Sequence, residues 1–155
     1  MHQISPDGIA FLKEKEGFRN DAYYDSANVL TIGYGHSAYA PSIEQYPVYE
    51  GQHITEEEGE EILRADLKPT EAAVNSAVTR EITQKQYDAL VSFTFNLGAG
   101  TFTSSDVLEF TNQGNYQAAG DAMLQYSYAG GEFIPGLRKR REEERAMYLS
   151  SLPQE

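Results

Sequence analysis

The 155-residue chain contains no cysteine and no tryptophan. Without thiols it can form no disulfide, and folding in a reducing cytoplasm stays open to it. The three histidines, His2, His36 and His53, lack the spacing of metal ligands, so the sequence predicts no metal site. No apolar run approaches about 18 residues, so we expect no insertion into a membrane. Residues 1–7 have neither a basic nor an apolar stretch, which predicts no secretory signal peptide.

Basic residues are also scarce: 12 lysines and arginines stand against 24 aspartates and glutamates, a formal net charge of −12. This balance argues against nucleic acid as a partner, because phosphate backbones attract basic surfaces. One interpretation is that the acidity serves solubility. The other is that another protein delivers the chain to its target, or that it works at high salt, where repulsion from anionic surfaces is screened.

The hydrophobic content is ordinary: 40% of the residues are apolar, as in soluble globular proteins. The length suits one compact domain, or two lobes that share a core. The sequence has no internal repeat and no low-complexity segment, and we expect a monomer.

The first third of the chain predicts a helix followed by a β-hairpin. Ser5 is a helix cap with Pro6 in the first turn, and Gly17 is a natural stop, so the helix should end near Glu16. Two strands follow, at residues 22–24 and 29–34, with a turn at 25–28 between them. A loop with a short third strand is expected at 37–54.

Helices are expected over most of the remaining chain. Thr55 and Glu58 form a capping box for a helix that Pro69 should kink or break near Lys68. Thr83 caps a helix that is apolar on nearly every side, which is typical of the buried centre of a helical lobe. Further helices are expected from a cap at Ser104 or Ser105 to residue 111, at 116–126 and at 136–150.

Together these elements predict an α+β fold, mostly helical, in a single domain of residues 1–155. Its parts are a small β-containing lobe at about 17–55, a connecting helix at about 56–79, and a helical lobe at about 80–150 that includes the first helix. A cleft between the two lobes would accommodate a long polymer.

Glu16, Asp25 and Thr31 are the strongest candidates for chemistry, at a helix end, in a turn and at the head of a strand. Cleavage of a glycosidic bond needs a protonated carboxyl as acid, an ionised carboxylate, and a hydroxyl that holds water. Each residue also has a structural interpretation: Glu16 with Glu14 as solvated charges, Asp25 as a turn former and Thr31 as a strand former. Asp21 lies nearby at the wrong spacing.

The order of these residues resembles the phage-type lysozymes, the endolysin family classified as glycoside hydrolase family 24. The pattern is Glu, eight residues, Asp, five residues and Thr, leading into Thr31–His36. Gln86–Gly100 resembles the central helix of the family, and Ala129–Gly131 with Pro135–Arg141 resembles its C-terminal segment. The resemblance covers residues 5–150 in order and implies a lysozyme-like fold.

The resemblance implies a muramidase that cleaves the β-1,4 bond between N-acetylmuramic acid and N-acetylglucosamine in peptidoglycan, without metal or cofactor. It implies that Glu16 is the general acid. Asp25 would activate water or stabilise the developing positive charge, and Thr31 would bind the attacking water. Inversion at the anomeric carbon is the implied outcome, which requires carboxyl groups about 6.5–9.5 Å apart.

The resemblance also assigns supporting residues. His36 should form a structural ion pair with Asp66. The substrate contacts implied by the resemblance are Gly35, Ser37, Phe95 and Ser105, of which Phe95 has plain core packing as an equal alternative. The chain departs from the family in having no tryptophan and in having Ala122 where some relatives have a polar contact, which affects the sugar subsites.

The basic run Arg138–Arg141 opens a helix, where positive charge opposes the helix dipole. Pairing of Arg138 and Arg141 with Glu16, with the acidic surface elsewhere or with an anionic polymer would explain these cations. The alternative is a solvated helix with charges of both signs.

Three functions remain in competition: a muramidase, a non-catalytic module that binds peptidoglycan or a partner on a lysozyme scaffold, and a chitinase-like enzyme for another glycan. For the first, we expect synthesis in the host cytoplasm and action on the wall in the periplasm. A phage holin or fusion to a larger delivered protein would provide the route.

Overall fold

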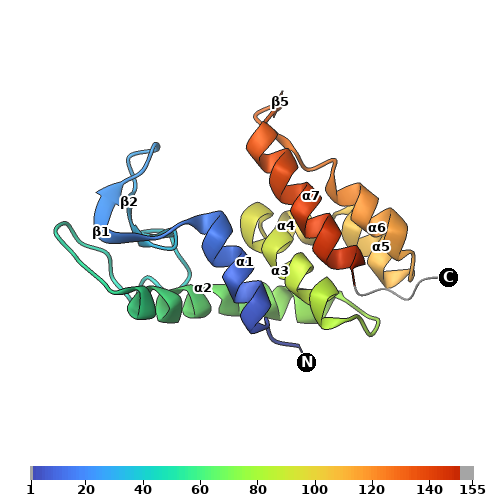
Figure 1. Ribbon diagram of the computed structural model, residues 1–155, viewed down its shortest axis with the longest axis horizontal. Coiled ribbons are helices and arrows are strands. Elements are labelled where there is room, and N and C mark those ends of the chain that lie inside the picture. Colours follow the sequence, from blue (N-terminus) through green and yellow to red (C-terminus); the bar gives the residue numbers. More distant parts are fainter. Residues whose placement is uncertain (1, 151–155) are drawn as a thin grey trace. The chain divides into compact units, whose positions relative to one another are not determined.

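The computed structural model describes residues 2–150 and divides into two compact units. We call residues 10–69 the hairpin unit, and residues 2–9 with 70–150 the helical unit. Two helices, α1 (Pro6–Glu16) and α2 (Glu56–Ala77), each contribute residues to both units. Figure 1 shows the elements in chain order. Within residues 2–150, no helix has both the length and the apolar character needed to cross a membrane.

The hairpin unit contains a three-stranded antiparallel sheet. β1 (Arg19–Tyr24) pairs with β2 (Leu30–Gly33), which pairs with β3 (His36–Ser37). The predicted hairpin is therefore confirmed, and the short third strand begins one residue before the loop in which it was expected. The core of the unit contains three buried isoleucines with partly buried neighbours: Ile32, Ile54 and Ile62, against Phe18, Ala22, Tyr46 and Val48.

The capping box at the start of α2 is confirmed. The backbone N–H of Glu58 donates to Thr55 Oγ1 at 3.1 Å, and the backbone N–H of Thr55 donates to Glu58 Oε1 at 3.0 Å. The sequence predicted a kink or a break near Lys68, and the break is wrong, because α2 continues through Pro69 to Ala77. Leu67 and Val74, before and after the proline, are fully buried, and such packing outweighs one missing backbone hydrogen bond.

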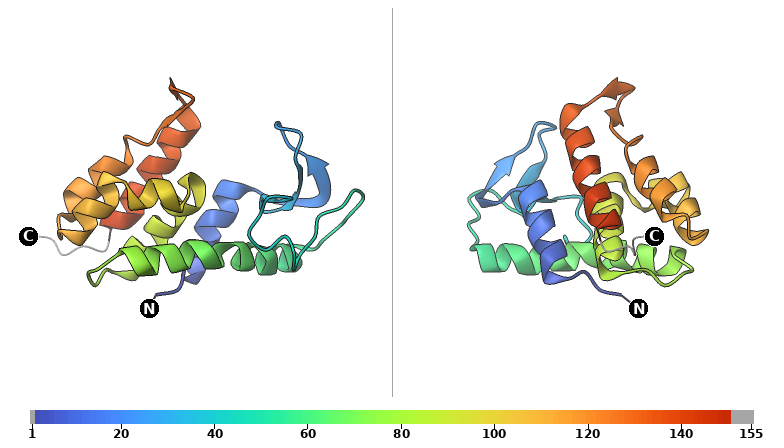
Figure 2. Two further views of the ribbon diagram at one scale, coloured as in Figure 1. Left: turned by 180° about the vertical axis from the view of Figure 1, so that it is seen from behind. Right: turned by 45° about the vertical axis from the view of Figure 1, so that its right-hand side comes forward.

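The helical unit is built around α3 (Gln84–Leu97), in which nine consecutive residues, 86–94, are buried. The Thr83 cap is confirmed as a full capping box with Gln86. α3 packs against α7 (Pro135–Leu149), which packs against α6 (Tyr116–Met123) (Figure 2). The prediction of a buried central helix is confirmed.

Ser105 caps α5 (Asp106–Asn112) as expected, but one short helix and one hairpin were not predicted. The short helix α4 (Ala99–Thr103) follows Gly98 directly. A hairpin of β4 (Tyr128–Ala129) and β5 (Glu132–Phe133) precedes α7. The Gly-Gly pair between these strands is a hairpin signal that sequence reasoning missed.

Candidate active site

Glu16 is the last residue of α1, and the helix stops there because Gly17 takes a φ of +70°. The N–H of Gly17 still donates to the carbonyl oxygen of Lys13 at 3.0 Å, so the final turn is complete. The Glu16 side chain is half-buried and faces the turn between β2 and β3. A methyl group on Gly35, in that turn, would lie 3.4 Å from Glu16 Oε1.

Lys13 anchors this last turn of α1 within the hairpin unit, a contact that sequence reasoning missed. Its Nζ forms an ion pair with Glu60 of α2 and lies 5.8 Å from the centre of the Tyr34 ring. Arg64 binds the other oxygen of Glu60 at 3.0 Å. The hydrogen bond to Glu60, aided by the charge of that carboxylate, raises the pKa of Lys13, although partial burial opposes the shift. The position of Glu16 therefore depends on α1, which carries it, and on α2, which binds Lys13 in the same helical turn.

Asp25 is fixed by the turn that it helps to form. Its Oδ1 accepts from the backbone N–H groups of Ala27 and Val29, both at 2.9 Å. Its own N–H donates to the carbonyl oxygen of Val29 at 2.9 Å, which extends the β1–β2 ladder by one pair. Asn28 has a φ of +62°, a conformation that asparagine tolerates better than most residues. These bonds leave the carboxylate little freedom to rotate.

Thr31 is buried on β2, with only 4% of its surface exposed. Its hydroxyl donates to the carbonyl oxygen of Val29 at 2.9 Å, so its lone pairs remain to accept a hydrogen bond. Thr31 stands opposite Tyr23 of β1 and Ser37 of β3. Because side chains alternate along a strand, Asp25 shares this face. Asp25 and Thr31 are diagonal neighbours on the two strands, an arrangement that places the Cα atoms roughly 7 Å apart.

His36 and Asp66 meet in a buried network. His36 Nδ1 lies 2.7 Å from Asp66 Oδ2, and His36 Nε2 lies 2.7 Å from the carbonyl oxygen of Tyr46. Asp66 Oδ1 accepts from the N–H and the hydroxyl of Ser42, at 3.1 and 2.6 Å. Burial by itself lowers the pKa of His36, but the bonds to Asp66 and Tyr46 and the charge of Asp66 outweigh it and raise that pKa. Ser42 and Tyr46 were not predicted from the sequence.

The basic run at the start of α7 is only partly solvated, so the interpretation as a solvated helix with charges of both signs is wrong for Arg140 and Arg141. Arg141 and Glu144 are fully buried, and Arg140 is 8% exposed. Glu144 Oε2 accepts from Ser92 Oγ at 2.6 Å, from Arg140 Nε at 3.2 Å and from Arg141 Nη2 at 3.2 Å. Packing against α3 removes these charges from water, and a partner one turn along the helix compensates them.

Arg138 and Arg141 therefore have different surroundings. Arg138 is 40% exposed and lies 3.6 Å from Glu142, one turn later. Arg141 Nη2 donates to Asn96 Oδ1 of α3 at 2.7 Å, and its guanidinium lies 5.2 Å from the centre of the Phe93 ring. Arg141 thus joins α7 to α3 inside the helical unit.

The expected substrate contacts fall in both units. Gly35 faces Glu16, and Ser37 stands opposite Thr31, so the hairpin unit brings both together with expected catalytic residues. Phe95 is half-buried near the end of α3. Ser105 is 4% exposed, and its hydroxyl accepts from the N–H of Leu108 and donates to the carbonyl oxygen of Phe102. The Ser105 hydroxyl is therefore engaged in capping α5.

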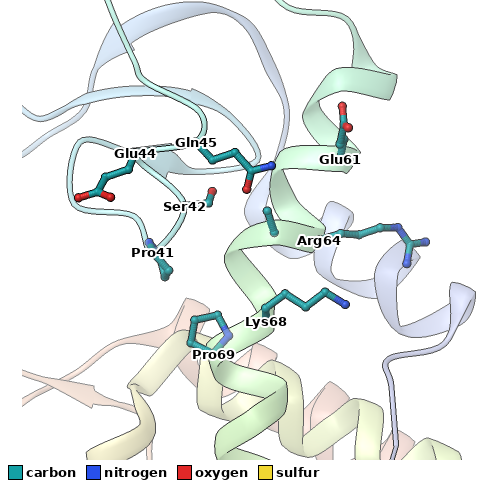
Figure 3. Close-up of a pocket in the computed structure, with 9 residues that line it drawn as sticks. Pro41, Ser42, Glu44, Gln45, Glu61, Arg64, Lys68 and Pro69 are labelled. Atoms are coloured by element: carbon teal, nitrogen blue, oxygen red, sulfur yellow. The ribbon is translucent and has the colours of Figure 1, made fainter.

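A cavity of about 550 Å³ in the hairpin unit contains none of the expected site residues. Figure 3 shows Ser42 and Gln45 of the loop on one side, and Glu61, Arg64 and Lys68 of α2 on the other. Ser42 connects this cavity to the His36–Asp66 network through its bonds to Asp66. Over the range 2–150, no group of three or more histidine, aspartate or glutamate residues is arranged to hold a metal ion.

Comparison with known proteins gives matches over most of the chain. The sequence profile of the phage lysozyme family matches residues 13–144. The endolysin of Salmonella phage P22 is 44% identical over 151 residues, which cover 97% of this chain and all of the relative. The chain spans about half the length of two Bacillus phage endolysins that it also matches.

Among solved structures, the chain also matches phage lysozymes and endolysins. A mutant of P22 lysozyme has a TM-score of 0.86 and 43% identity, over 96% of this chain and 99% of that one. The endolysin of Escherichia coli O157:H7 phage FAHEc1 has a TM-score of 0.87 and 36% identity, over 99% and 98%. Over residues 2–150 the fold is therefore α+β and lysozyme-like, with seven helices and small antiparallel sheets.

Proposed function

Because the chain belongs to the phage lysozyme family, we propose that it is a peptidoglycan hydrolase of the muramidase type. The bond cleaved is the β-1,4 linkage between N-acetylmuramic acid and N-acetylglucosamine. One observation carries the proposal. The hairpin unit holds a carboxyl group beside the β2–β3 turn, and a carboxylate and a hydroxyl on one face of its sheet: Glu16, Asp25 and Thr31.

Glu16 acts as the general acid that protonates the glycosidic oxygen as the bond breaks. Its place at a helix end anchored by Lys13 gives it a fixed position, and Gly35 leaves room beside its carboxyl group. Positioning of this kind supplies much of the rate of a hydrolase, because a misplaced catalytic group loses its effective concentration.

Asp25 and Thr31 hold the attacking water. The Thr31 hydroxyl donates its one hydrogen bond to the carbonyl oxygen of Val29, so it accepts a hydrogen bond from the water. Asp25 takes a proton from that water, or stabilises the positive charge that develops on the sugar ring. Attack from the face opposite the leaving group inverts the anomeric carbon, and the water needs carboxyl groups about 6.5–9.5 Å apart.

The remaining residues have supporting roles in the proposal. The pair of His36 and Asp66 stabilises the hairpin unit. Arg138 and Arg141, each with its own partners, stabilise α7 in the helical unit. Gly35, Ser37 and Phe95 contact the substrate. Ser105 is proposed as a fourth contact, and its hydroxyl also caps α5. We propose that residues 1–155 act as a monomeric lysozyme-like domain on the wall in the periplasm, after release from the host cytoplasm.

The test is the loss of turbidity of Gram-negative cells whose outer membrane has been permeabilised. We expect lysis by the wild type and a rate lower by about 10²–10⁴-fold for Glu16→Gln. The matched control is Glu14→Gln, two residues earlier, whose side chain is 75% exposed and which should lyse normally. Equal lysis by wild type and Glu16→Gln would refute the acid assignment. Folded protein that binds peptidoglycan without lysing cells would favour the binding module, and cleavage of chitin oligosaccharides alone would favour the chitinase-like alternative.

A further inference from the structure

The β4–β5 hairpin exposes every one of its residues, 128–133, to solvent. Gly130 and Gly131 form its two-residue turn with φ values of +59° and +82°, the conformation of a type I′ turn. A Cβ on either glycine would meet no atom within 4 Å. The base is closed by a hydrogen bond of 2.8 Å from the N–H of Ile134 to the carbonyl oxygen of Ser127. The tip of the hairpin is thus a defined turn with open space beside both glycines.

Two aromatic rings occupy the base of this hairpin. Tyr128 and Phe133 are directly opposite in register, with ring centres 5.7 Å apart and planes at 71°. Tyr128 is 58% exposed and Phe133 is 49% exposed. The edge of one ring meets the face of the other, a favourable geometry that keeps the pair together without a core behind it.

An exposed aromatic pair contributes little to folding. A two-stranded hairpin is marginally stable in water, and rings left half in solvent forgo much of the stabilisation that burial gives. Exposed aromatic residues beside a tight turn are typical of a binding surface, because tyrosine and phenylalanine offer contact area at a low entropic cost. The geometry of Tyr128 and Phe133 therefore points to a ligand.

The scarcity of charged residues on the hairpin limits the classes of ligand that it can bind. Residues 127–134 contain one charged side chain, Glu132, and no lysine or arginine. Nucleic acid and anionic lipid require cations at the contact, so they do not fit this surface. A pyranose ring does fit, because it presents C–H groups on its face and hydroxyl groups at its rim. The aromatic rings match the face, and the Tyr128 hydroxyl can hydrogen-bond the rim.

We propose that Tyr128 and Phe133 form a sugar-contact surface for the glycan strand, separate from the residues proposed for catalysis. This inference rests on the proposed function in one respect, that the glycan is the one the enzyme hydrolyses. The surface adds binding to a sugar ring and takes no part in bond cleavage.

The experiment measures binding of the full chain, carrying Glu16→Gln to prevent turnover, to purified insoluble peptidoglycan. We expect Tyr128→Ala with Phe133→Ala to weaken binding about tenfold or more, and Tyr128→Phe, which keeps the ring, to bind within about threefold of its parent. Tyr39→Ala and Tyr49→Ala are the matched controls, since these tyrosines are 83% and 59% exposed in another part of the chain. They should bind normally.

In the active chain, the double substitution should raise KM and leave kcat and the unfolding temperature unchanged. Binding equal to that of the parent would overturn the proposal. So would an equal loss for the controls, or a loss of dimers in size-exclusion chromatography with glycan binding unchanged, which would mark a self-association surface. The two proposals can fail separately: wild type that binds glycan through this pair but lyses no cells would refute only the hydrolase.

Discussion

Gly35 lies so close to Glu16 that a methyl group on its Cα would stand 3.4 Å from Glu16 Oε1. Gly35 also has a φ of +76°, in the region that favours glycine. Gly35→Ala should therefore cost about 1–2 kcal/mol of stability through backbone strain. It should also lower kcat, because the methyl group occupies space beside the proposed acid.

The control for this change is Gly51→Ala. Gly51 has a φ of +81°, and a methyl group there would meet nothing within 4 Å. The two variants should have similar unfolding free energies in urea, but only Gly35→Ala should lose activity. If both variants changed kcat equally, the effect of Gly35→Ala would not come from its place beside Glu16.

Asp25→Asn should abolish most activity and leave the turn intact. The Oδ1 of asparagine can still accept from the N–H groups of Ala27 and Val29, so we expect little change in stability. Loss of the negative charge should lower kcat about 10²-fold or more. Asp21→Asn, at an exposed aspartate in β1 that pairs with His53, should retain full activity in the same lysis assay.

Thr31→Val removes the hydroxyl and keeps the branched side chain of a strand residue. We expect kcat to fall about 10²-fold, because in the proposed mechanism the attacking water loses its hydrogen-bond acceptor. Loss of the bond to Val29 should cost about 1 kcal/mol of stability. Thr31→Ser retains the hydroxyl and should recover most of the activity. If serine performs no better than valine, the hydroxyl is not the group that matters.

Asp66→Asn should destabilise the chain in a way that depends on pH. Leaving His36 without its anionic partner in a buried site should cost about 3 kcal/mol. The raised pKa of His36 means that the stabilisation is present in full below about pH 6.5, the value in the unfolded chain. It is lost as the pH rises through the raised value of the folded state.

The difference between wild type and Asp66→Asn should thus be largest near pH 5.5 and shrink in alkaline solution. Thermal unfolding across this range measures it. The exposed pair of Asp21 and His53 provides the comparison, with side chains 78% and 63% exposed. Asp21→Asn should change stability by less than about 0.5 kcal/mol at any of these pH values. A pH-independent deficit for Asp66→Asn would contradict the role given to His36.

Glu144→Gln should be among the most destabilising single changes in α7. It leaves the buried guanidinium of Arg141 without its carboxylate, at a cost of about 3–5 kcal/mol. Glu142→Gln on the same helix affects a side chain that is 57% exposed and should be close to neutral. Urea unfolding of the two variants side by side gives the comparison.

Local chemistry explains which elements the sequence predicted well. The caps at Thr55, Thr83 and Ser105 depend on side chains that reach a backbone group three residues away. Such bonds form wherever the helix begins, whatever packs on it later. The missed α4 and β4–β5 elements are short, and no alternation or helical period runs long enough in them to be recognised.

The candidate site also contains residues that local features predict and residues that only long-range contacts bring in. The spacing of Glu16, Asp25 and Thr31 identified them as candidates, because the helix end, the turn and the strand are all local features. Lys13 with Glu60, and Ser42 with Asp66, join residues 47 and 24 positions apart. No pattern in the sequence marks such pairs, since many charged and polar residues would serve as partners.

By itself, then, the sequence determined the helix caps, the β1–β2 hairpin and the order of the candidate residues Glu16, Asp25 and Thr31. Only the tertiary structure decided that α2 continues through Pro69, that Glu144 is buried with Arg141, and that Tyr128 and Phe133 are left in solvent. The physical reason is that capping and turn formation act within a few residues. Burial depends on which distant segments cover a side chain, and it determines whether a charge or a ring is compensated, strained or free to bind.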